Sequence, residues 1–307
     1  MTSSSGSAAV PEAAMVAEFP DPLRLEVEGY LEALRFTADP AIDGLQEAMR
    51  YSLLAGGKRI RPVLTLATAE AIDLERSAVL PLAAAIELIH TYSLIHDDLP
   101  AMDDDDLRRG RPSCHKAFGE DVAILAGDAL YAEAFRLLLA DPGSHPRNLL
   151  AAACELAAAT GVEGMVGGQY IDIAEKAPPG PEGLRRLHEL KTGRLIAASI
   201  ECVLLLDGGL GPDKIQFFST FARELGVLFQ IVDDILDVTG SSETLGKHQG
   251  SDERLGKRTY VTEFGLNGAR DLALQSRDRA RTALKRAAPG GALELEQITD
   301  FIANRTY

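Results

Sequence analysis

Two clusters of aspartate residues are notable because each is embedded in apolar, helix-like sequence. The first runs from Asp97 to Asp106 and contains six aspartates, and the second comprises Asp233, Asp234 and Asp237. Carboxylates that are crowded together away from water repel one another and take up protons unless a cation lies between them. Mg²⁺ is a hard cation that is satisfied by a few carboxylate oxygens, water and phosphate oxygens. The two clusters therefore predict a magnesium site that binds a diphosphate.

The first cluster is expected at the end of a helix. Residues 80–98 read as a buried helix, and Pro100 disfavours helical geometry in the residue before it. The helix should end near Asp97, and the loop after it should carry Asp103 back toward Asp97. A negative charge at the C-terminus of a helix is unfavourable with the helix dipole, so a bound cation would stabilise this arrangement. The alternative is a solvated acidic loop.

The second cluster is expected on one side of a helix. Gln230, Asp233, Asp234 and Asp237 follow the i, i+3, i+4, i+7 pattern and so form one polar stripe in otherwise apolar sequence. An exposed acidic face is the alternative, but a surface helix would show more polar residues in this stretch. The stripe therefore predicts a second wall of the same metal site.

Basic residues that can bind phosphate oxygens occur around both clusters. Arginine binds phosphate oxygens in pairs, and lysine acts as a compact point charge. Any one of them alone is compatible with an ordinary surface charge, but the set beside two acidic clusters indicates that two diphosphates are bound. The candidates are Lys58, Arg59 and Arg61 after the two-glycine turn Gly56–Gly57, Arg108 and Arg109, Lys191 with Thr192, Lys247, and Lys257.

One histidine and one glycine-rich segment allow more than one interpretation. His90 lies about two helical turns before Asp97 and hence on roughly the same face, within reach of a phosphate, although a core histidine is an equal alternative. Glu87 and His90 have the Glu-x-x-His form of a di-iron bundle, but that fold needs a second copy. The segment 164–169 lacks the Lys-Ser/Thr of a P-loop and a preceding strand, so close helix packing explains its glycines better.

Helical spacing of apolar residues pervades the chain, and alternating strand patterns are hard to find, which predicts an almost all-α protein. No convincing linker or fixed-period repeat divides the chain. We therefore expect a disordered tail over residues 1–20 and one domain over residues 21–307. With 307 residues and 46% hydrophobic content, that domain can bury a large core.

The net charge and the cysteine content of the chain restrict the cellular compartment and the binding partners that we expect. The net charge of −15 argues against nucleic acid as a partner. Cys114, Cys154 and Cys202 occur singly, which fits a reducing cytoplasm better than a disulfide framework. The N-terminus has neither a basic start nor a sustained apolar run, so a signal peptide is not expected, and no uninterrupted apolar run is long enough to predict an integral membrane segment.

Together these motifs resemble the trans-isoprenyl diphosphate synthases, specifically the bacterial farnesyl diphosphate synthases and their short-chain geranylgeranyl relatives. The likeness runs from about Leu45 to the C-terminus. It implies an all-α bundle around a deep central cavity, usually as a homodimer. The motifs that carry it are residues 56–62, residues 97–103 with 107–110 after them, residues 191–193, residues 229–237, and Leu-Gly-Lys at both 245–247 and 255–257.

The resemblance also implies roles for individual residues. The candidate metal ligands are Asp97, Asp98, Asp103, Asp233 and Asp237, with two Mg²⁺ on Asp97 and Asp103 and a third on Asp233. The residues expected to contact the allylic diphosphate are Arg108, Lys191, Thr192, Gln230, Lys247 and Lys257, and those expected to hold isopentenyl diphosphate are Lys58, Arg61, His90 and Arg109. Asp97, Asp103, Asp233, Lys191 and Arg108 are the candidate catalytic residues.

The implied reaction is a head-to-tail condensation of isopentenyl diphosphate with dimethylallyl or geranyl diphosphate. Three Mg²⁺ and several cationic side chains stabilise the departing diphosphate, and the released diphosphate removes the proton. Ser93 and Tyr92 lie four and five residues before Asp97, about 6 to 7.5 Å down the helix. The resemblance implies that an aromatic ring at Tyr92 stops elongation of the product at 15 carbons (C15). We therefore expect farnesyl diphosphate, with geranylgeranyl diphosphate as the alternative.

Two further functions would use a similar scaffold. A terpene cyclase shares the Mg²⁺, the helical bundle and the carbocation, but its second metal motif is typically of the Asn/Asp-Ser/Thr-Glu type, whereas this chain has aspartates at 233, 234 and 237. A non-catalytic isoprenoid-binding regulatory subunit is the other alternative. Such subunits usually lose acids from one cluster, and this chain has both.

Overall fold

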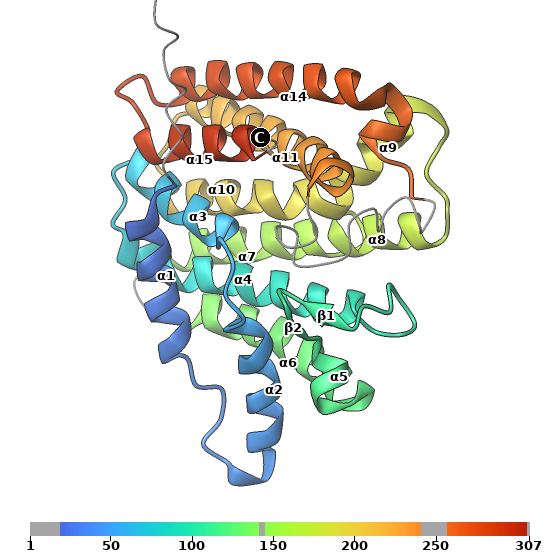
Figure 1. Cartoon of the computed structure of the whole chain (residues 1–307). Coiled ribbons are helices and arrows are strands. Elements are labelled where there is room, and N and C mark those ends of the chain that lie inside the picture. Colours follow the sequence, from blue (N-terminus) through green and yellow to red (C-terminus); the bar gives the residue numbers. More distant parts are fainter. Residues whose placement is uncertain (1–18, 141–144, 241–256, 306–307) are drawn as a thin grey trace, which may run out of the picture.

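The computed structural model describes residues 19–140, 145–240 and 257–305, and these are almost entirely α-helical (Figure 1). The prediction of an all-α protein is confirmed. Within the described residues the strands are β1 (Leu107–Arg108) and β2 (Arg111–Pro112), which form one antiparallel pair. The helices are α1 (Asp21–Ala33), α2 (Asp43–Leu53), α3 (Ile60–Ala71), α4 (Arg76–Asp97), α5 (Cys114–Phe118), α6 (Glu120–Leu139), α7 (Pro146–Thr160), α8 (Met165–Ile173), α9 (Gly180–His188), α10 (Arg194–Asp207), α11 (Pro212–Thr239), α14 (Tyr260–Ala287) and α15 (Leu293–Asn304), with the 3₁₀ turn η1 (Pro40–Ile42) and the π-helical turn η2 (Glu189–Gly193).

The core is built around α4 and α11, the two helices that carry the aspartate clusters. α4 packs against α3, α6 and α10, and α11 packs between α10 and α14 (Figure 1). The helically spaced apolar residues of α4, such as Leu82 and Ile86, are fully buried, as are Phe221 and Leu225 of α11. Burial of such side chains contributes about 1.5–3 kcal/mol each. The two clusters are thus positioned by helices that contribute fully buried side chains to the core.

The two helices end differently beside the site. α4 ends at Asp97, and the backbone N–H of Asp103 donates to the carbonyl oxygen of Asp97 at 2.9 Å, which brings the loop back over the helix end. This confirms the predicted helix end and the predicted return of Asp103. α11 continues beyond its cluster to Thr239, so its aspartates are held within a regular helix. The first cluster is therefore on a loop and the second on a rigid element.

At the N-terminus, the described chain begins at Phe19, which is 8% exposed, and its ring centroid lies 4.9 Å from that of Phe301 in α15. Residues 1–18 of the predicted tail lie outside the described residues. The predicted boundary at residue 20 thus falls just inside the packed chain, because an aromatic side chain at residue 19 already contacts the core. The single-domain organisation remains a prediction.

Two segments are long and apolar enough to cross a membrane by length and composition alone, namely α4 and the segment Pro146–Ile173, which contains α7 and α8. In α4, 67% of the most apolar window is buried inside the bundle, and in the other segment 44% is buried. The core helix of a globular protein passes the same test. The two segments are therefore weak evidence for membrane insertion, and α4 is accounted for by its packing.

Candidate active site

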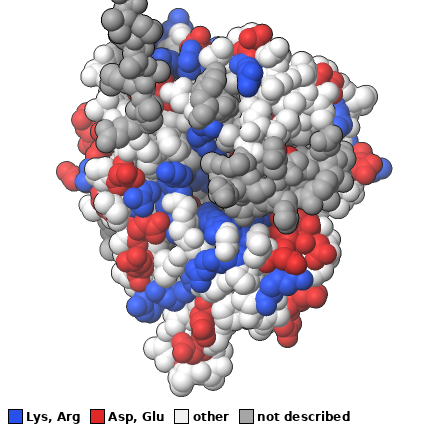
Figure 2. All heavy atoms as spheres, in the orientation of Figure 1, with Lys and Arg blue, Asp and Glu red and all other residues white. Residues whose placement is uncertain are grey.

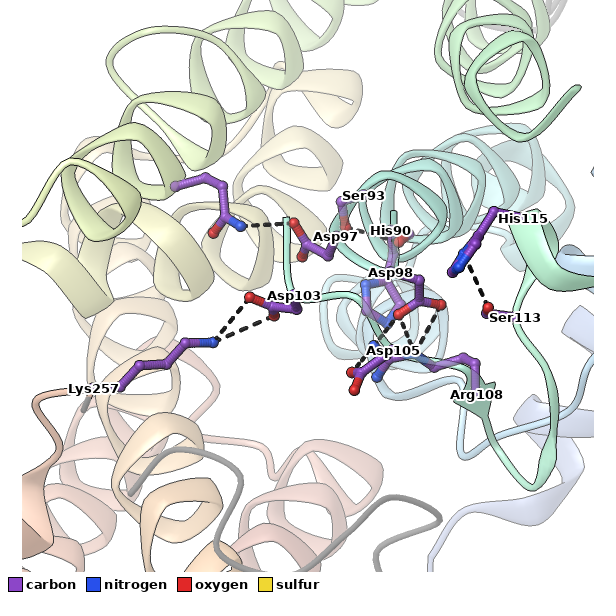
Figure 3. Close-up of polar contacts among 11 residues, drawn as sticks. His90, Ser93, Asp97, Asp98, Asp103, Asp105, Arg108, Ser113, His115 and Lys257 are labelled. Atoms are coloured by element: carbon purple, nitrogen blue, oxygen red, sulfur yellow. Dashed lines mark hydrogen bonds and ion pairs between the residues drawn. The ribbon is translucent and has the colours of Figure 1, made fainter. Parts of the chain in front are cut away.

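The first aspartate cluster already has partners from other parts of the fold. Asp97 accepts a hydrogen bond from Gln169 Nε2 of α8 at 2.7 Å. Both carboxylate oxygens of Asp103 lie 3.3 Å from Lys257 Nζ, which reaches across from the segment before α14 (Figure 3). Burial raises the pKa of Asp97 to about 6, Lys191 opposes the shift and Asp103 adds to it. The wall is thus a partly desolvated group of carboxylates that a cation would stabilise.

Asp98 points to a different partner from its neighbours. It is 2% exposed and accepts hydrogen bonds from the guanidinium of Arg108, with the Nε to Oδ1 distance at 3.0 Å. Arg108 belongs to β1 and also contacts Asp105 at 3.3 Å (Figure 3). Burial raises the pKa of Asp98 and the Arg108 guanidinium opposes this. The predictions for Asp98 as a metal ligand and for Arg108 as a diphosphate ligand stay untested, but here the two side chains bind each other.

The second cluster does not form one uniform stripe. Asp233 is exposed, whereas Asp234 and Asp237 are 2% and 4% exposed. Asp234 accepts from Gln230 Nε2 at 2.7 Å with one oxygen and from the backbone N–H of Tyr260 at 2.7 Å with the other. Asp234 therefore ties α11 to the first residue of α14 and occupies the amide of Gln230. Of these aspartates, Asp233 has the exposure that a ligand to a bound ion requires.

The charge of Asp233 interacts with that of Arg61, one of the predicted phosphate-binding arginines. Burial lowers the pKa of Arg61, whereas the charges of Glu87 and Asp233 raise it. Arg61 in turn places one guanidinium nitrogen 3.4 Å from His90 Nε2. Burial, together with the surrounding arginines, of which Arg61 and Arg109 contribute most, lowers the pKa of His90 well below its usual value. His90 is therefore a neutral imidazole in a positively charged region, which favours an anionic ligand.

The two-glycine turn admits a further arginine into this region. Arg109 donates to the carbonyl oxygen of Gly56, and a Cβ added to Gly57 would lie 2.9 Å from Arg109 Cζ. Gly57 also has a φ of +119°, which a side chain would strain. Lys58 is exposed, with its Nζ 5.4 Å from the ring of Phe301. On the face of the molecule that Figure 2 shows, lysine and arginine side chains form a band. The turn thus places Arg109 against Gly56 and Gly57, the two residues before Lys58.

Arg59, which sequence reasoning grouped with the phosphate-binding cations, has a structural role instead. It is 3% exposed, and its guanidinium donates to Glu28 at 2.8 Å and to Glu87 at 2.6 Å. It also donates to the carbonyl oxygen of Leu53 at 2.7 Å. Glu87, which suggested a di-iron motif together with His90, is thus the buried counter-ion of Arg59. The network fixes the turn from which Lys58 projects.

Lys191 lies on the π-helical turn η2, a feature that often marks functional sites. Its Nζ contacts Asp172 of α8 at 2.6 Å. A Cβ added to Gly168 would lie 2.3 Å from the backbone nitrogen of Lys191, and one added to Gly226 would lie 3.0 Å from the Cα of Gly193. Gly168 therefore supports the interpretation of the glycine-rich segment as a helix-packing element. Close packing on both sides holds η2 against the site.

A cavity of about 430 Å³ brings together seven of the predicted residues, namely Arg61, His90, Tyr92, Ser93, Asp97, Lys191 and Thr192, whereas Asp233, Gln230, Lys58, Arg108 and Arg109 are not part of its lining. A neighbouring cavity of about 400 Å³ shares Met102 and Ile173 with it and is lined by Asp103, Asp172 and Lys257. Lys247, predicted to contact the allylic diphosphate, lies outside the described residues. The residues that line the first cavity are Arg61, His90, Tyr92, Ser93, Leu94, His96, Asp97, Met102, Met165, Val166, Gln169, Tyr170, Ile173, Lys191, Thr192 and Leu195.

Three polar residues of the site were not predicted. Gln169 and Asp172 lie three residues apart on α8 and bind Asp97 and Lys191, respectively. A polar pair at helical spacing in an apolar stretch is a signal that could have identified them. Arg305, beside the end of α15, has its guanidinium carbon 5.4 Å from the ring of Phe229, the ring that Arg61 also contacts at 5.6 Å. No sequence motif near residue 305 indicated this approach.

Within the described residues, one group of side chains has its ligand atoms preassembled for a metal ion. Asp104, Asp106 and His115 bring one ligand atom each to within 4.8 Å of one another. The group lies just after Asp103 but contains none of the predicted metal ligands. Asp106 pairs with Lys116 at 2.8 Å. His115 Nδ1 lies 3.0 Å from Ser113 Oγ, a contact drawn in Figure 3. Lys116 therefore neutralises Asp106 within the protein.

The fold and the site together define a class of enzyme. An all-α bundle contains an apolar cavity whose lining includes Asp97 of α4, Arg61 of α3 and Lys191 of η2, which suits a diphosphate ester of an apolar chain. That is the isoprenoid-synthase class. The sequence matches the Polyprenyl synthetase family over residues 42–289. The protein belongs to this family, the trans-isoprenyl diphosphate synthases, and is a prenyltransferase.

Individual relatives agree with this assignment. The chain is 44% identical over 281 residues to the farnesyl diphosphate synthase of Escherichia coli (strain K12), covering 90% of this chain and 93% of that protein. It is 47% identical over 268 residues to the large subunit 1 of the chloroplastic heterodimeric geranylgeranyl pyrophosphate synthase of Arabidopsis thaliana, covering 85% and 72%. The structure of a geranyltransferase from Helicobacter pylori, complexed with magnesium and isoprenyl diphosphate, matches with a TM-score of 0.79 at 32% identity, covering 95% and 96%.

Proposed function

We propose that this prenyltransferase condenses isopentenyl diphosphate with dimethylallyl or geranyl diphosphate to give farnesyl diphosphate, a C15 product, and diphosphate. The observation that carries this proposal is the position of Tyr92. Its side chain lies on the same helix as Asp97, lines the same cavity and is 8% exposed, so its ring limits the depth available to a growing chain. The Escherichia coli relative, a farnesyl diphosphate synthase, supports the same product.

The carboxylates of the site fit Mg²⁺. Asp97, Asp103 and Asp233 supply oxygen ligands alone, which is the donor type that Mg²⁺ prefers. The raised pKa of Asp97 reflects a buried charge that a divalent cation would stabilise. We propose that Asp97 and Asp103 hold two ions and that Asp233 holds a third, with Asp98 and Asp237 in supporting positions. Bound Mg²⁺ would supply Lewis-acid stabilisation of the leaving diphosphate.

The basic residues divide into two groups in this proposal. Lys191, Thr192 and Lys257 lie on the side of the aspartates and would bind the allylic diphosphate, with Gln230, Lys247 and Arg108 as the further candidates. Lys58, Arg61, His90 and Arg109 would bind isopentenyl diphosphate. Because His90 is neutral, it donates a single hydrogen bond and leaves the positive charge to the arginines. The separation keeps the two diphosphates on opposite sides of the reacting carbons.

The residues then act by binding and by excluding water. The allylic C1–O bond breaks as its electron pair leaves with the diphosphate, and the isopentenyl double bond attacks the resulting cation. The proton lost from the new chain passes to the released diphosphate. Leu195, Met165 and Val166 provide apolar walls that keep water from the cation. No strong base from the protein is required.

Geranylgeranyl diphosphate, the C20 product, is the second candidate. The observation in its favour is the similarity to the Arabidopsis thaliana geranylgeranyl pyrophosphate synthase subunit at an identity comparable with that of the Escherichia coli enzyme. A non-catalytic regulatory subunit is the third candidate. Retention of Asp97, Asp103 and Asp233 argues against it, because a regulatory subunit has no need of three metal ligands.

One assay tests these candidates. The purified protein is incubated with isopentenyl diphosphate, each allylic starter and Mg²⁺, and the dephosphorylated products are separated by size. We expect C15 as the main product, while C20 would support the second candidate and no product from the pure chain the third. Asp233→Ala should lose nearly all turnover, whereas Asp213→Ala, an exposed acid on the same helix, should retain it. Full activity of Asp233→Ala would contradict the metal role.

We also propose that the protein is a homodimer in the cytoplasm. Large apolar side chains are exposed on α6 and α7, namely Leu125 at 56%, Leu139 at 49% and Leu150 at 61%. Covering them with a second copy would remove apolar surface from water. The three cysteines are free thiols, as expected in a reducing compartment. Light scattering coupled to size-exclusion chromatography would give the assembly mass, and a monomer at working concentration would contradict the dimer.

A further inference from the structure

We propose that Tyr131 of α6 forms a second layer of the cavity floor beneath Tyr92 and that the two rings together set the length of the product. The inference rests on the proposed function, in which the cavity holds the growing isoprenoid chain. It adds a specificity-determining residue from a helix that carries none of the predicted site residues. The evidence is the arrangement of three aromatic rings from α4 and α6.

Tyr131 of α6 packs against the ring of Tyr92. The centroids of the two rings are 5.1 Å apart at an interplanar angle of 79°, which is an edge-to-face contact. Tyr92 lines the cavity and Tyr131 does not. Phe135, one turn further along α6, contacts Tyr131 in turn at 5.3 Å and 66°. The floor is therefore a stack in which Tyr92 is the surface layer and Tyr131 the layer below.

The lower layer is held from a third helix. The Tyr131 hydroxyl lies 3.5 Å from Thr160 Oγ1 at the end of α7, a weak contact at the limit of hydrogen bonding. Thr160 is fully buried, and its own hydroxyl donates to the carbonyl oxygen of Leu156 at 2.9 Å. The Tyr131 hydroxyl therefore has a buried neighbour in α7, in addition to the contact of its ring with Tyr92. A chain end pressing on Tyr92 would meet resistance from α7 through Tyr131.

Close approach of α4 and α6 also fixes the upper layer. A Cβ added to Gly127 would lie 2.2 Å from His96 Nε2, so the missing side chain at this position leaves space for the imidazole. His96 places that nitrogen 3.1 Å from the carbonyl oxygen of Ile124, and its ring contacts Tyr92 at 5.7 Å. Tyr92 thus lies between His96 of its own helix and Tyr131 of α6. Neither neighbour belongs to the predicted chain-length residues.

Two layers predict a stepwise response to truncation. Removing the Tyr92 ring opens the cavity only as far as the face of Tyr131, because large-to-small changes in packed regions leave a space bounded by the next side chains. Removing the Tyr131 ring alone leaves Tyr92 in place but without support, so the floor yields to some chain ends. Removing both opens the cavity toward Phe135. Each step adds depth on the scale of an isoprene unit.

The test measures product lengths of five variants beside the unmodified protein at matched conversion. Tyr92→Ala should shift the main product from C15 to C20, and Tyr131→Ala should give C15 with added C20. The double variant should give C25 or longer. Tyr131→Phe keeps the ring and loses only the hydroxyl, so it should retain the C15 product. Tyr30→Ala, a partly buried tyrosine on α1, controls for general loss of packing.

The outcomes separate this inference from the proposed function. If the unmodified protein makes C15 and the double variant gives the same products as Tyr92→Ala, Tyr131 is no part of the floor. If the unmodified protein makes C20, the C15 assignment fails, and the inference then requires Tyr131→Ala to lengthen that C20 product. Should Tyr131→Ala not fold, as judged by circular dichroism and thermal unfolding, Tyr131→Leu replaces it with the same expected direction.

Discussion

The two aspartate clusters differ in what holds their carboxylates before any ligand binds. On the loop after α4, Asp103 is paired with a lysine from the far side of the cavity and Asp97 with a glutamine of α8. On α11, Asp234 is fixed by a backbone N–H and an amide inside the protein, and Asp233 is exposed. In the first wall, metal ions can replace the lysine and the glutamine as partners of the carboxylates. In the second wall, Asp233 is available for binding, whereas Asp234 has a structural role.

Substitutions of Asp233 and Asp234, which are neighbours on α11, should therefore affect different properties of the protein: the first its activity and the second its stability. Asp233→Ala should abolish most turnover, with a fall of about 10²–10³ in kcat of the kind seen when one electrostatic stabiliser is removed. Its stability should stay within about 0.5 kcal/mol of the unmodified protein, because the residue is exposed. Asp234→Ala should instead lower the free energy of unfolding by about 1–3 kcal/mol, since the N–H of Tyr260 and the amide of Gln230 lose a buried acceptor. Denaturant unfolding and steady-state kinetics measure the two effects.

Asp234→Asn provides the matched control for that pair. Asparagine keeps one oxygen for the Tyr260 N–H, and the Gln230 amide can rotate to accept from the new NH₂ group. Most of the stability should therefore return, apart from about 0.3–1 kcal/mol that a negative charge contributes at the start of α14. If Asp234→Ala unfolds like the unmodified protein and loses only activity, the division between a binding acid and a structural acid is wrong.

The same contrast shows what the sequence could and could not predict. The i, i+3, i+4, i+7 pattern correctly placed Gln230, Asp233 and Asp234 on one helix, and Pro100 correctly marked the end of α4. Periodicity alone cannot distinguish adjacent residues of a polar stripe, because which of them is buried depends on α14. The split between Asp233 and Asp234 could therefore not be predicted. A helical period describes one element, whereas burial depends on its neighbours.

For the same reason, only part of the aromatic floor of the cavity could be predicted from the sequence. Tyr92 was identified from its distance to Asp97 along one helix, which the rise per residue fixes. Tyr131 and Thr160 approach it from α6 and α7, and only the packing of three helices brings them together. Arg59 was grouped with the phosphate-binding cations for a related reason. A cation in a phosphate-binding motif does not reveal that Glu28 and Glu87 lie beside it in the fold.

The loop wall should show a pH dependence of metal binding. Asp97 has a pKa raised from 3.8 to about 6 by burial, so without metal its contribution to folding is present below pH 3.8 and is lost as the pH rises through about 6. Mg²⁺ binds the ionised form and reverses this loss. The increase in Tm caused by Mg²⁺ should therefore grow as the pH rises through about 6, and below that pH the Mg²⁺ affinity should fall about tenfold per pH unit.

Thermal scans with and without Mg²⁺ across this range measure the effect. Asp97→Asn is the control, because the amide has no charge to lose and its Mg²⁺-induced Tm change should be small and much flatter with pH. A Tm increase that is the same on both sides of pH 6 in the unmodified protein would mean that Asp97 is ionised throughout. In that case burial would not control the ionisation of the Asp97 carboxylate.

The smallest expected effect concerns the exchange of partners on the loop wall. Lys257 and Asp103 have side chains that are 24% and 27% exposed, so their pairing contributes about 0.2–1 kcal/mol. Mg²⁺ must compete with Lys257 for Asp103, and Lys257→Gln should therefore tighten Mg²⁺ binding in the absence of diphosphate by up to about fivefold, the equivalent of 1 kcal/mol. The same change should raise the KM for the allylic substrate, because the lysine is then missing from the diphosphate. Arg24→Gln removes an exposed pair with Asp21 on α1, a helix that carries none of the predicted ligands, and should alter neither quantity. Calorimetry measures the Mg²⁺ affinity, and an unchanged affinity in Lys257→Gln would show that the lysine does not compete with the metal. Evidence that the loop wall exchanges its partners, unlike the wall on α11, would then come from Asp97 and Gln169 alone.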